Sequence, residues 1–153
     1  MPEGRPANKP TTQPAIVVAF DFGLRRIGIA SGDTLTRTAH PRTAITNGPQ
    51  GPDWPTLDKL LADSRPACLA VGEPYNADGS ESPLTKAARQ FAAELGRRAM
   101  LPVDLIDERW SSQDAEERLR GMRASGERTR RVTREAVDAA AAAVILERWF
   151  ETH

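Results

Sequence analysis

The sequence predicts a single α/β domain in which the first three strands are antiparallel and the later two are parallel. The three early strand-like segments, 15–20, 27–30 and 36–46, follow one another across short polar turns, which is typical of hairpin connections. The two later ones, 67–71 and 103–107, are each reached through a helical segment, and helical crossovers join parallel strands. A length of 153 residues suits one domain with a sizeable core.

The strands are predicted from runs of apolar and β-branched residues. Residues 15–20 read Ala-Ile-Val-Val-Ala-Phe, a continuous run typical of a strand buried on both faces, and the run ends at Asp21-Phe22-Gly23. The turn Leu24-Arg25-Arg26 then leads into Ile-Gly-Ile-Ala at 27–30. Thr and Ile at strand-like density predict the third strand.

The helices are predicted from apolar residues at spacings of three and four. They cover 54–63, about fourteen residues from Leu84, a segment capped by Ser111 or Ser112, and 134–150. The loops between these elements are rich in Gly, Pro or polar residues and cover 47–55, 72–83 and 121–131. Because residues 1–14 are rich in Pro and lack periodicity, we expect a flexible tail followed by a domain over 15–151.

The composition excludes several classes of protein. Cys68 is the single cysteine, so no disulfide can form within the chain, and we expect a cytoplasmic location. No run approaches the roughly 18 apolar residues of a membrane span, so we expect no membrane partner. The formal net charge of zero seems to speak against nucleic acid, but the segment 118–134 contains seven Arg and one Glu.

Three acidic positions interrupt apolar patterns. Asp21 ends the first strand, Asp107-Glu108 ends the last one, and Asp138 shares an apolar helix face with the positions four, seven and eleven residues later. Side chains alternate along a strand, so at most one of Asp107 and Glu108 can join Asp21. The carboxyl ends of strands are where ligands gather in open α/β sheets. A turn cap for Asp21 and an ion pair with Arg109 for Glu108 are the simpler alternatives.

Oxygen donors without His or Cys partners suit Mg²⁺ or Mn²⁺ better than Zn²⁺. His40 and His153 form no recognisable set with a nucleophile, and Cys68 lies within a strand, where we expect it to pack inertly. The Arg residues near each acid suit phosphate, since a guanidinium makes bidentate phosphate contacts. In the loop that follows the fourth strand, Asn76 and Ser80 can donate to a phosphate and Tyr75 can stack on a base.

Four segments together resemble the YqgF/RuvX family of bacterial RNase H-like proteins. They are Asp-Phe-Gly-Leu-Arg-Arg-Ile-Gly-Ile-Ala at 21–30, Asn-Ala-Asp-Gly-Ser at 76–80, Asp-Glu-Arg at 107–109 and Asp-Ala-Ala-Ala-Ala at 138–142. They occur in the family's order and span about 16–150. Two positions depart from the family pattern: Glu73 replaces an apolar residue, commonly Leu, and Ala77 replaces a frequent Met. Glu73 is either an outer-shell carboxylate or a perturbation of the loop.

The resemblance implies an RNase H-like fold, with a five-stranded mixed sheet (strands 1–3 antiparallel, 4–5 parallel) flanked by helices. It also implies a nuclease that matures the 5′ end of the small-subunit rRNA precursor, in which three carboxylates hold the catalytic metal: Asp21, Glu108 and Asp138. We hypothesise hydrolysis with two metal ions about 3.5–4 Å apart, bridged by Asp21. The residues expected to hold the nucleic acid, whether precursor rRNA or branched DNA, are Arg25, Arg26, Asn76, Ser80, Arg109, Arg130, Arg131 and Arg134.

Three other functions are compatible with parts of this pattern. A Holliday junction resolvase would take branched DNA, and a non-catalytic nucleic-acid-binding or transcription-associated factor would use the fold for recognition alone. An actin-like or sugar-kinase-type phosphotransfer domain also carries Asp-x-Gly after its first strand. That fold needs two such domains and a second phosphate loop, for which 153 residues leave no room. We expect a monomer or a weak dimer.

Overall fold

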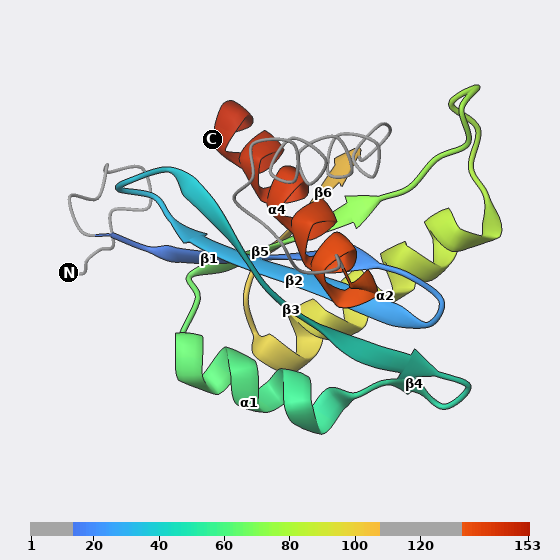
Figure 1. Ribbon diagram of the computed structural model, residues 1–153, viewed down its shortest axis with the longest axis horizontal. Coiled ribbons are helices and arrows are strands. Elements are labelled where there is room, and N and C mark those ends of the chain that lie inside the picture. Colours follow the sequence, from blue (N-terminus) through green and yellow to red (C-terminus); the bar gives the residue numbers. More distant parts are fainter. Residues whose placement is uncertain (1–13, 108–132) are drawn as a thin grey trace, which may run out of the picture.

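The computed structural model describes residues 14–107 and 133–153 (Figure 1). Its sheet has the strand order β4-β3-β2-β1-β5-β6, antiparallel from β4 to β1 and parallel from β1 to β6. The elements are β1 (Ile16–Phe22), β2 (Arg26–Asp33), β3 (Thr38–Gly48), β4 (Gly51–Pro52), α1 (Trp54–Ser64), β5 (Cys68–Glu73), α2 (Pro83–Ala99), β6 (Val103–Asp107) and α4 (Arg134–Thr152). The expected tail, the helix starting at Ser111 or Ser112 and the 121–131 loop lie outside the described residues.

The predicted strand directions are confirmed, but the sheet has six strands and not five. The additional strand, β4, is two residues long and pairs with Asn47 and Gly48. Two residues cannot show an alternating pattern, so the sequence predicted a loop there. The structure also extends β1 through Asp21 to Phe22, and β5 to Glu73. Pairing with β2 holds this last part of β1 in the sheet, since Asp21 lies opposite Gly28.

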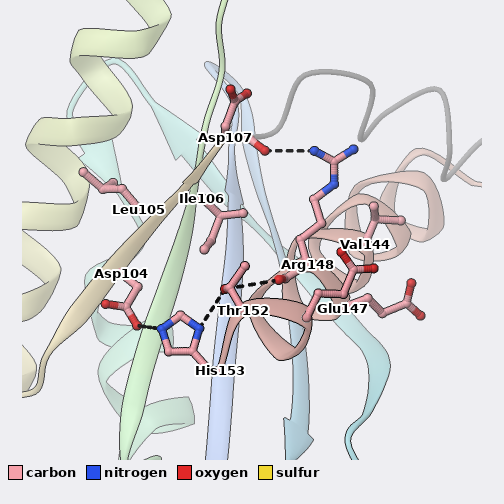
Figure 2. Close-up of a pocket in the computed structure, with 10 residues that line it drawn as sticks. Asp104, Leu105, Ile106, Asp107, Val144, Glu147, Arg148, Thr152 and His153 are labelled. Carbon is pink, nitrogen blue, oxygen red and sulfur yellow. Dashed lines mark hydrogen bonds and ion pairs between the residues drawn. The ribbon is translucent and has the colours of Figure 1, made fainter.

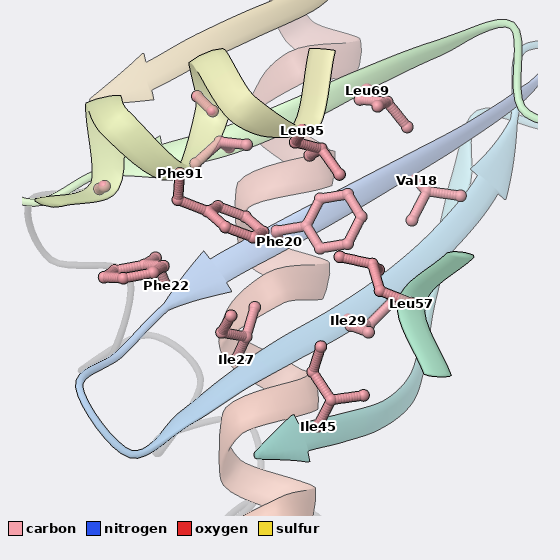
Figure 3. Packing of buried hydrophobic residues seen from close by; sticks show 13 residues of the cluster. Val18, Phe20, Phe22, Ile27, Ile29, Ile45, Leu57, Leu69, Phe91 and Leu95 are labelled. Carbon is pink, nitrogen blue, oxygen red and sulfur yellow. The ribbon is translucent and has the colours of Figure 1, made fainter. Parts of the chain in front are cut away.

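The two faces of the sheet carry different helices (Figure 1). Val18, Phe20 and Phe22 point from β1 into a core that α1 and α2 cover (Figure 3). Phe91 of α2 is central to this core, with its ring centroid 5.8 Å from that of Phe20 and 5.2 Å from that of Phe22. Fully burying one such side chain contributes about 1.5–3 kcal/mol. The alternate residues Val17 and Ala19 point to the other face and pack against α4.

Helix α4 lies close to β2 because, after Arg26, β2 presents only small residues on this face. Gly28, Ala30 and Gly32 alternate along the strand, and Ala30 packs on Ala142 of α4. A Cβ atom built on Gly28 would lie 1.9 Å from the carbonyl oxygen of Asp138, and one on Gly32 would lie 3.2 Å from the Leu146 side chain. The N-terminal end of α4 therefore packs directly on the backbone of β2.

Local sequence signals set the helix ends. Ser82 caps α2 and forms a capping box with Thr85, while Asp53 and Thr133 cap α1 and α4. No helix within 14–107 and 133–153 is long and apolar enough to cross a membrane. Burial, together with the charge of Asp104, raises the pKa of the Cys68 thiol to about 11, so this cysteine stays protonated and unreactive at neutral pH.

Candidate active site at the carboxyl end of the first strand

Asp21 and Asp138 are distant in sequence but lie at the same end of the α4 face of the sheet. Asp21 follows Val17 and Ala19 in the β1 alternation, so its side chain points to the face that α4 covers. Its partner across the ladder is Gly28, and the backbone of Asp138 lies on Gly28. The two carboxylates therefore stand at the same end of the same face.

Asp138 is bound to an arginine of the neighbouring strand. The Nε atom of Arg26 donates to Oδ2 of Asp138 at 2.6 Å, and the two side chains are 30% and 24% exposed. Arg26 precedes Gly28 by two residues, so it lies on the α4 face as well. The helix face was predicted to be apolar apart from Asp138, and Ala142, Ile145 and Trp149 are indeed buried there.

Asp107 lies on the opposite face from Asp21 and Asp138. In the parallel ladder Asp107 is the partner of Glu73, and neighbouring partners share a face. Glu73 forms an ion pair with Arg89 of α2, so its side chain faces α2 and not α4. Of the two acids at the end of β6, Asp107 is therefore not the one that joins Asp21. Glu108 lies outside the described residues, together with Arg109, Arg130 and Arg131.

The turn between β1 and β2 is fastened to β3 by Asn47, a buried residue that the sequence analysis did not single out. The backbone amide of Asn47 donates to the Arg25 carbonyl at 2.7 Å, and its side-chain amide donates to the Gly23 carbonyl at 2.6 Å. Leu24 and Arg25 are exposed at the tip. Most of β3 is exposed or half-buried, so no apolar pattern in the sequence signals this contact.

We expect Asn47→Ala to lower the free energy of unfolding by about 1–2 kcal/mol, because the Gly23 carbonyl loses its donor. For a chain of this size that corresponds to a fall of roughly 2–8 °C in Tm. The measurement is thermal unfolding followed by circular dichroism. Thr46→Ala, at the exposed neighbouring position of β3, is the control and should leave Tm within about 1 °C. Equal Tm values for the two variants would contradict the role of Asn47.

The loop after β5 is built by the residues that were predicted to hold nucleic acid. The side-chain amide of Asn76 donates to Ser80 Oγ at 2.9 Å, and its backbone amide donates to the Ser80 carbonyl at 2.9 Å. The Ser80 hydroxyl donates to Asp78 at 2.6 Å, and this bond, with that from the Ser80 amide, lowers the pKa of Asp78. Gly79 has a φ of +89°, which favours glycine at the turn. Asn76 and Ser80 therefore shape the loop whatever else they bind.

A cavity of about 750 Å³ lies between β6 and the end of α4, and neither Asp21 nor Asp138 lines it (Figure 2). The polar groups around it hold the two elements together. Trp149 Nε1 donates to Asp104 at 2.7 Å, His153 Nε2 lies 3.3 Å from the same carboxylate, and Arg148 donates to the Asp107 carbonyl at 2.9 Å. We interpret this cluster as the attachment of α4 to the edge strand.

Comparison with known proteins assigns the fold and the family. The family model described as "RuvX: Holliday junction resolvase" matches residues 15–152. The chain belongs to this family. A relative from Xanthomonas campestris pv. campestris (strain B100) is 48% identical over 135 residues, which cover 88% of this chain and 86% of that protein. One from Xanthomonas oryzae pv. oryzae (strain PXO99A) is 47% identical over 133 residues, covering 87% and 85%. Both carry the provisional name of a pre-16S rRNA nuclease.

Solved structures confirm the RNase H-like fold that the resemblance implied. RuvC of T. thermophilus in complex with a Holliday junction substrate aligns over 90% of this chain and 94% of its own, with a TM-score of 0.54 and 19% identity. A second Thermus thermophilus RuvC structure aligns over 90% of this chain and 95% of its own, with a TM-score of 0.51 and 18% identity. At this identity the similarity is one of fold.

The structure accounts for both departures from the RuvX family pattern. Glu73 is paired with Arg89 of α2, which also binds Glu81 at 2.9 Å and donates to the Tyr75 hydroxyl at 3.1 Å. These bonds raise the pKa of Arg89 and tie the two ends of the loop to α2. Because Glu73 faces α2, it is not an outer-shell carboxylate of the Asp21–Asp138 pair. Ala77 is exposed in the loop, so the exchange for Met leaves the core unchanged.

The donor set at the Asp21–Asp138 pair fits a hard divalent cation. Two carboxylates stand on one face at one end of the sheet, next to a strand position where only glycine fits. Within 14–107 and 133–153, no group of three or more His, Cys, Asp and Glu side chains gathers, so any third protein ligand would lie outside these residues. Oxygen ligands alone suit Mg²⁺ or Mn²⁺.

Proposed function

We propose that the protein is a nuclease that hydrolyses phosphodiester bonds in a reaction dependent on Mg²⁺ or Mn²⁺, and that its substrate is the precursor of the small-subunit rRNA. The placement of Asp21 and Asp138 next to Gly28, at the same end of the α4 face, is the observation that carries this proposal. Carboxylates at one end of a face repel a phosphate unless cations balance their charge. Arg26 pairs with Asp138, and a divalent cation bound at this end would balance the charge when a phosphate approaches. The naming of the relatives at 47–48% identity supports RNA as the substrate.

The ligands in this proposal are Asp21, Asp138 and Glu108. When bound, divalent ions activate an attacking water and neutralise the charge that develops on the leaving oxygen. Asp21 is held in place by the β1–β2 ladder and Asp138 by the contact of α4 with Gly28, so both ligands stand on rigid elements. Such preorganisation keeps the carboxylates in position without a further conformational change.

Arginines around the pair are proposed to bind the phosphate backbone. Arg25 is exposed on the fastened turn next to Asp21, and Arg134 is exposed one helical turn before Asp138. Arg109, Arg130 and Arg131 would add to this surface. The Asn76–Ser80 loop follows β5, which is parallel to β1, so it leaves the sheet at the same edge and is proposed to position the strand. Backbone contacts of this kind orient nucleic acid without reading its sequence.

Resolution of a Holliday junction is the second candidate, because the family model carries that description and the fold resembles RuvC. The two candidates differ in substrate and share the same two carboxylates. A non-catalytic binding role would not require two carboxylates at this end of the α4 face.

The test is incubation of the purified protein with a precursor small-subunit rRNA and, separately, with a four-way DNA junction, each with Mg²⁺ and with EDTA. We expect Mg²⁺-dependent cleavage at the 5′ end of the RNA precursor and intact junctions. Paired cuts in the junction with intact RNA would replace the rRNA assignment by the resolvase assignment. Cleavage of neither substrate, with Mg²⁺ or with Mn²⁺, would overturn the nuclease proposal.

A further inference from the structure

The ion pair between Arg26 and Asp138 places a cation on one of the proposed metal ligands. Arg26 Nε is 2.6 Å from Asp138 Oδ2, and both side chains are partly buried, at 30% and 24% exposure. Two residues 112 positions apart in sequence are joined in this way. The contact is charge-assisted and within the distance range of strong hydrogen bonds, so it neutralises much of the carboxylate charge.

A guanidinium and a divalent cation compete for the same carboxylate of Asp138. The lone pairs of Oδ2 that accept the Arg26 hydrogen bond are among those that a metal ion would use. Two positive charges at a few ångströms also repel each other, and the repulsion is stronger at a partly buried site than in water. Binding of the metal is therefore expected to weaken the Arg26–Asp138 contact, and the contact is expected to weaken metal binding.

The position of Arg26 shows where its side chain can go once it leaves Asp138. It is the first residue of β2, directly after the exposed Arg25, on a turn that Gly23 and Asn47 hold in place. It lies on the same face as Asp21 and is 30% exposed, so a rotation of the side chain carries the guanidinium to the surface beside the pair. A nucleic-acid phosphate approaching this pair would meet it there.

We propose that Arg26 is an exchangeable counter-ion of Asp138: a divalent cation displaces it, and the released guanidinium then binds the substrate phosphate. Metal binding and nucleic-acid binding are coupled through this one carboxylate, each strengthening the other. The inference rests on the proposed function, since it assigns Asp138 to the metal. It adds that Arg26 changes its partner during the cycle, from Asp138 to the substrate phosphate.

The first test measures Mn²⁺ binding alone, by electron paramagnetic resonance of the free ion, in the absence of nucleic acid. We expect Arg26→Gln to bind Mn²⁺ about tenfold more tightly than the unmodified protein, because a competing cation is removed. Arg25→Gln is the matched control: it removes the same charge one residue away on an exposed side chain, and its effect should stay within about twofold. Arg26→Lys, which keeps the charge without the planar fork, should fall between the two.

A double-mutant cycle tests whether the competition acts through Asp138. In an Asp138→Asn background, Arg26→Gln should change Mn²⁺ affinity by no more than about twofold. The coupling is then measured by fluorescence anisotropy of a labelled single-stranded RNA, in EDTA and in Ca²⁺. We expect the cation to strengthen RNA binding by about fivefold in the unmodified protein and by clearly less in Arg26→Gln.

The outcomes separate this inference from the proposed function. Unchanged or weaker Mn²⁺ binding by Arg26→Gln would overturn the exchange and leave Arg26 as a group that only orients Asp138. Wild-type Mn²⁺ affinity in Asp138→Asn would remove Asp138 from the metal site and overturn the proposed function with it. Circular dichroism of each variant confirms that its fold is retained.

Discussion

Gly28→Ala is expected to destabilise the protein by about 3 kcal/mol or more, which is at the upper end of what overpacking usually costs. The added Cβ would lie 1.9 Å from the Asp138 carbonyl oxygen and 3.1 Å from the Ala139 amide nitrogen. Both are backbone atoms, so no side-chain rotation can relieve the clash, and α4 has to move as a body. For a chain of this size the loss corresponds to a fall of roughly 6–12 °C in Tm.

Gly48→Ala is the matched control for this experiment. Gly48 ends β3, and a Cβ atom built on it meets nothing within 4 Å. Thermal unfolding of the two variants compares the effect of one added methyl group at a position packed against backbone atoms, Gly28, with its effect at a position open to solvent, Gly48. A Tm of Gly28→Ala equal to that of Gly48→Ala would contradict the close approach of α4 to β2. Where Gly28→Ala still folds, we expect weaker Mn²⁺ binding, because Asp138 has moved away from Asp21.

Asp21→Asn is expected to lower Mg²⁺-dependent cleavage by about a thousandfold or more, a loss of roughly 4 kcal/mol of transition-state stabilisation. The exchange keeps the size and shape of the side chain and removes the charge that the proposed cation requires. The backbone of Asp21 remains paired with Gly28, so we expect circular dichroism and Tm close to those of the unmodified protein. Activity is measured as the single-turnover rate on the cleaved substrate.

Asp107→Asn is the control that makes this result specific. Asp107 also ends a strand at the carboxyl edge of the sheet, but its ladder partner Glu73 faces α2. Removing its charge should change the cleavage rate by no more than about twofold. Retained activity in Asp21→Asn, or an equal loss in Asp107→Asn, would contradict the assignment of the site to the α4 face.

The fold was predictable because its signals are local. The continuous apolar run of 15–20 predicts a strand buried on both faces, and Val17 to Phe20 are fully buried. The alternation of helices and strands after residue 54 predicts the parallel part of the sheet, which is observed. A two-residue strand such as β4 has no such signal, since its pairing depends on where β3 places Asn47 and Gly48.

The candidate site was predictable only in part, because its remaining features depend on contacts between distant segments. The sequence predicts Asp21 at a strand end and Asp138 on a buried helix face. It does not indicate that α4 packs on Gly28, which brings the two residues to the same end of the sheet. The pairing of Arg26 with Asp138 joins elements at opposite ends of the chain. The sequence alone does not tell on which face of the sheet the Glu73 side chain lies. The pairing of β5 with β6 and the ion pair with Arg89 place it on the α2 face.

The central claim is that Asp21 and Asp138 hold a divalent cation on the α4 face of the sheet. The most direct measurement is a crystal structure of the protein grown with Mn²⁺, with anomalous diffraction used to locate the ion. We predict an anomalous peak within about 2.0–2.6 Å of carboxylate oxygens of both residues. Manganese bound elsewhere, for example at Asp104 and Glu147 in the cavity beside β6, with none between Asp21 and Asp138, would contradict the account.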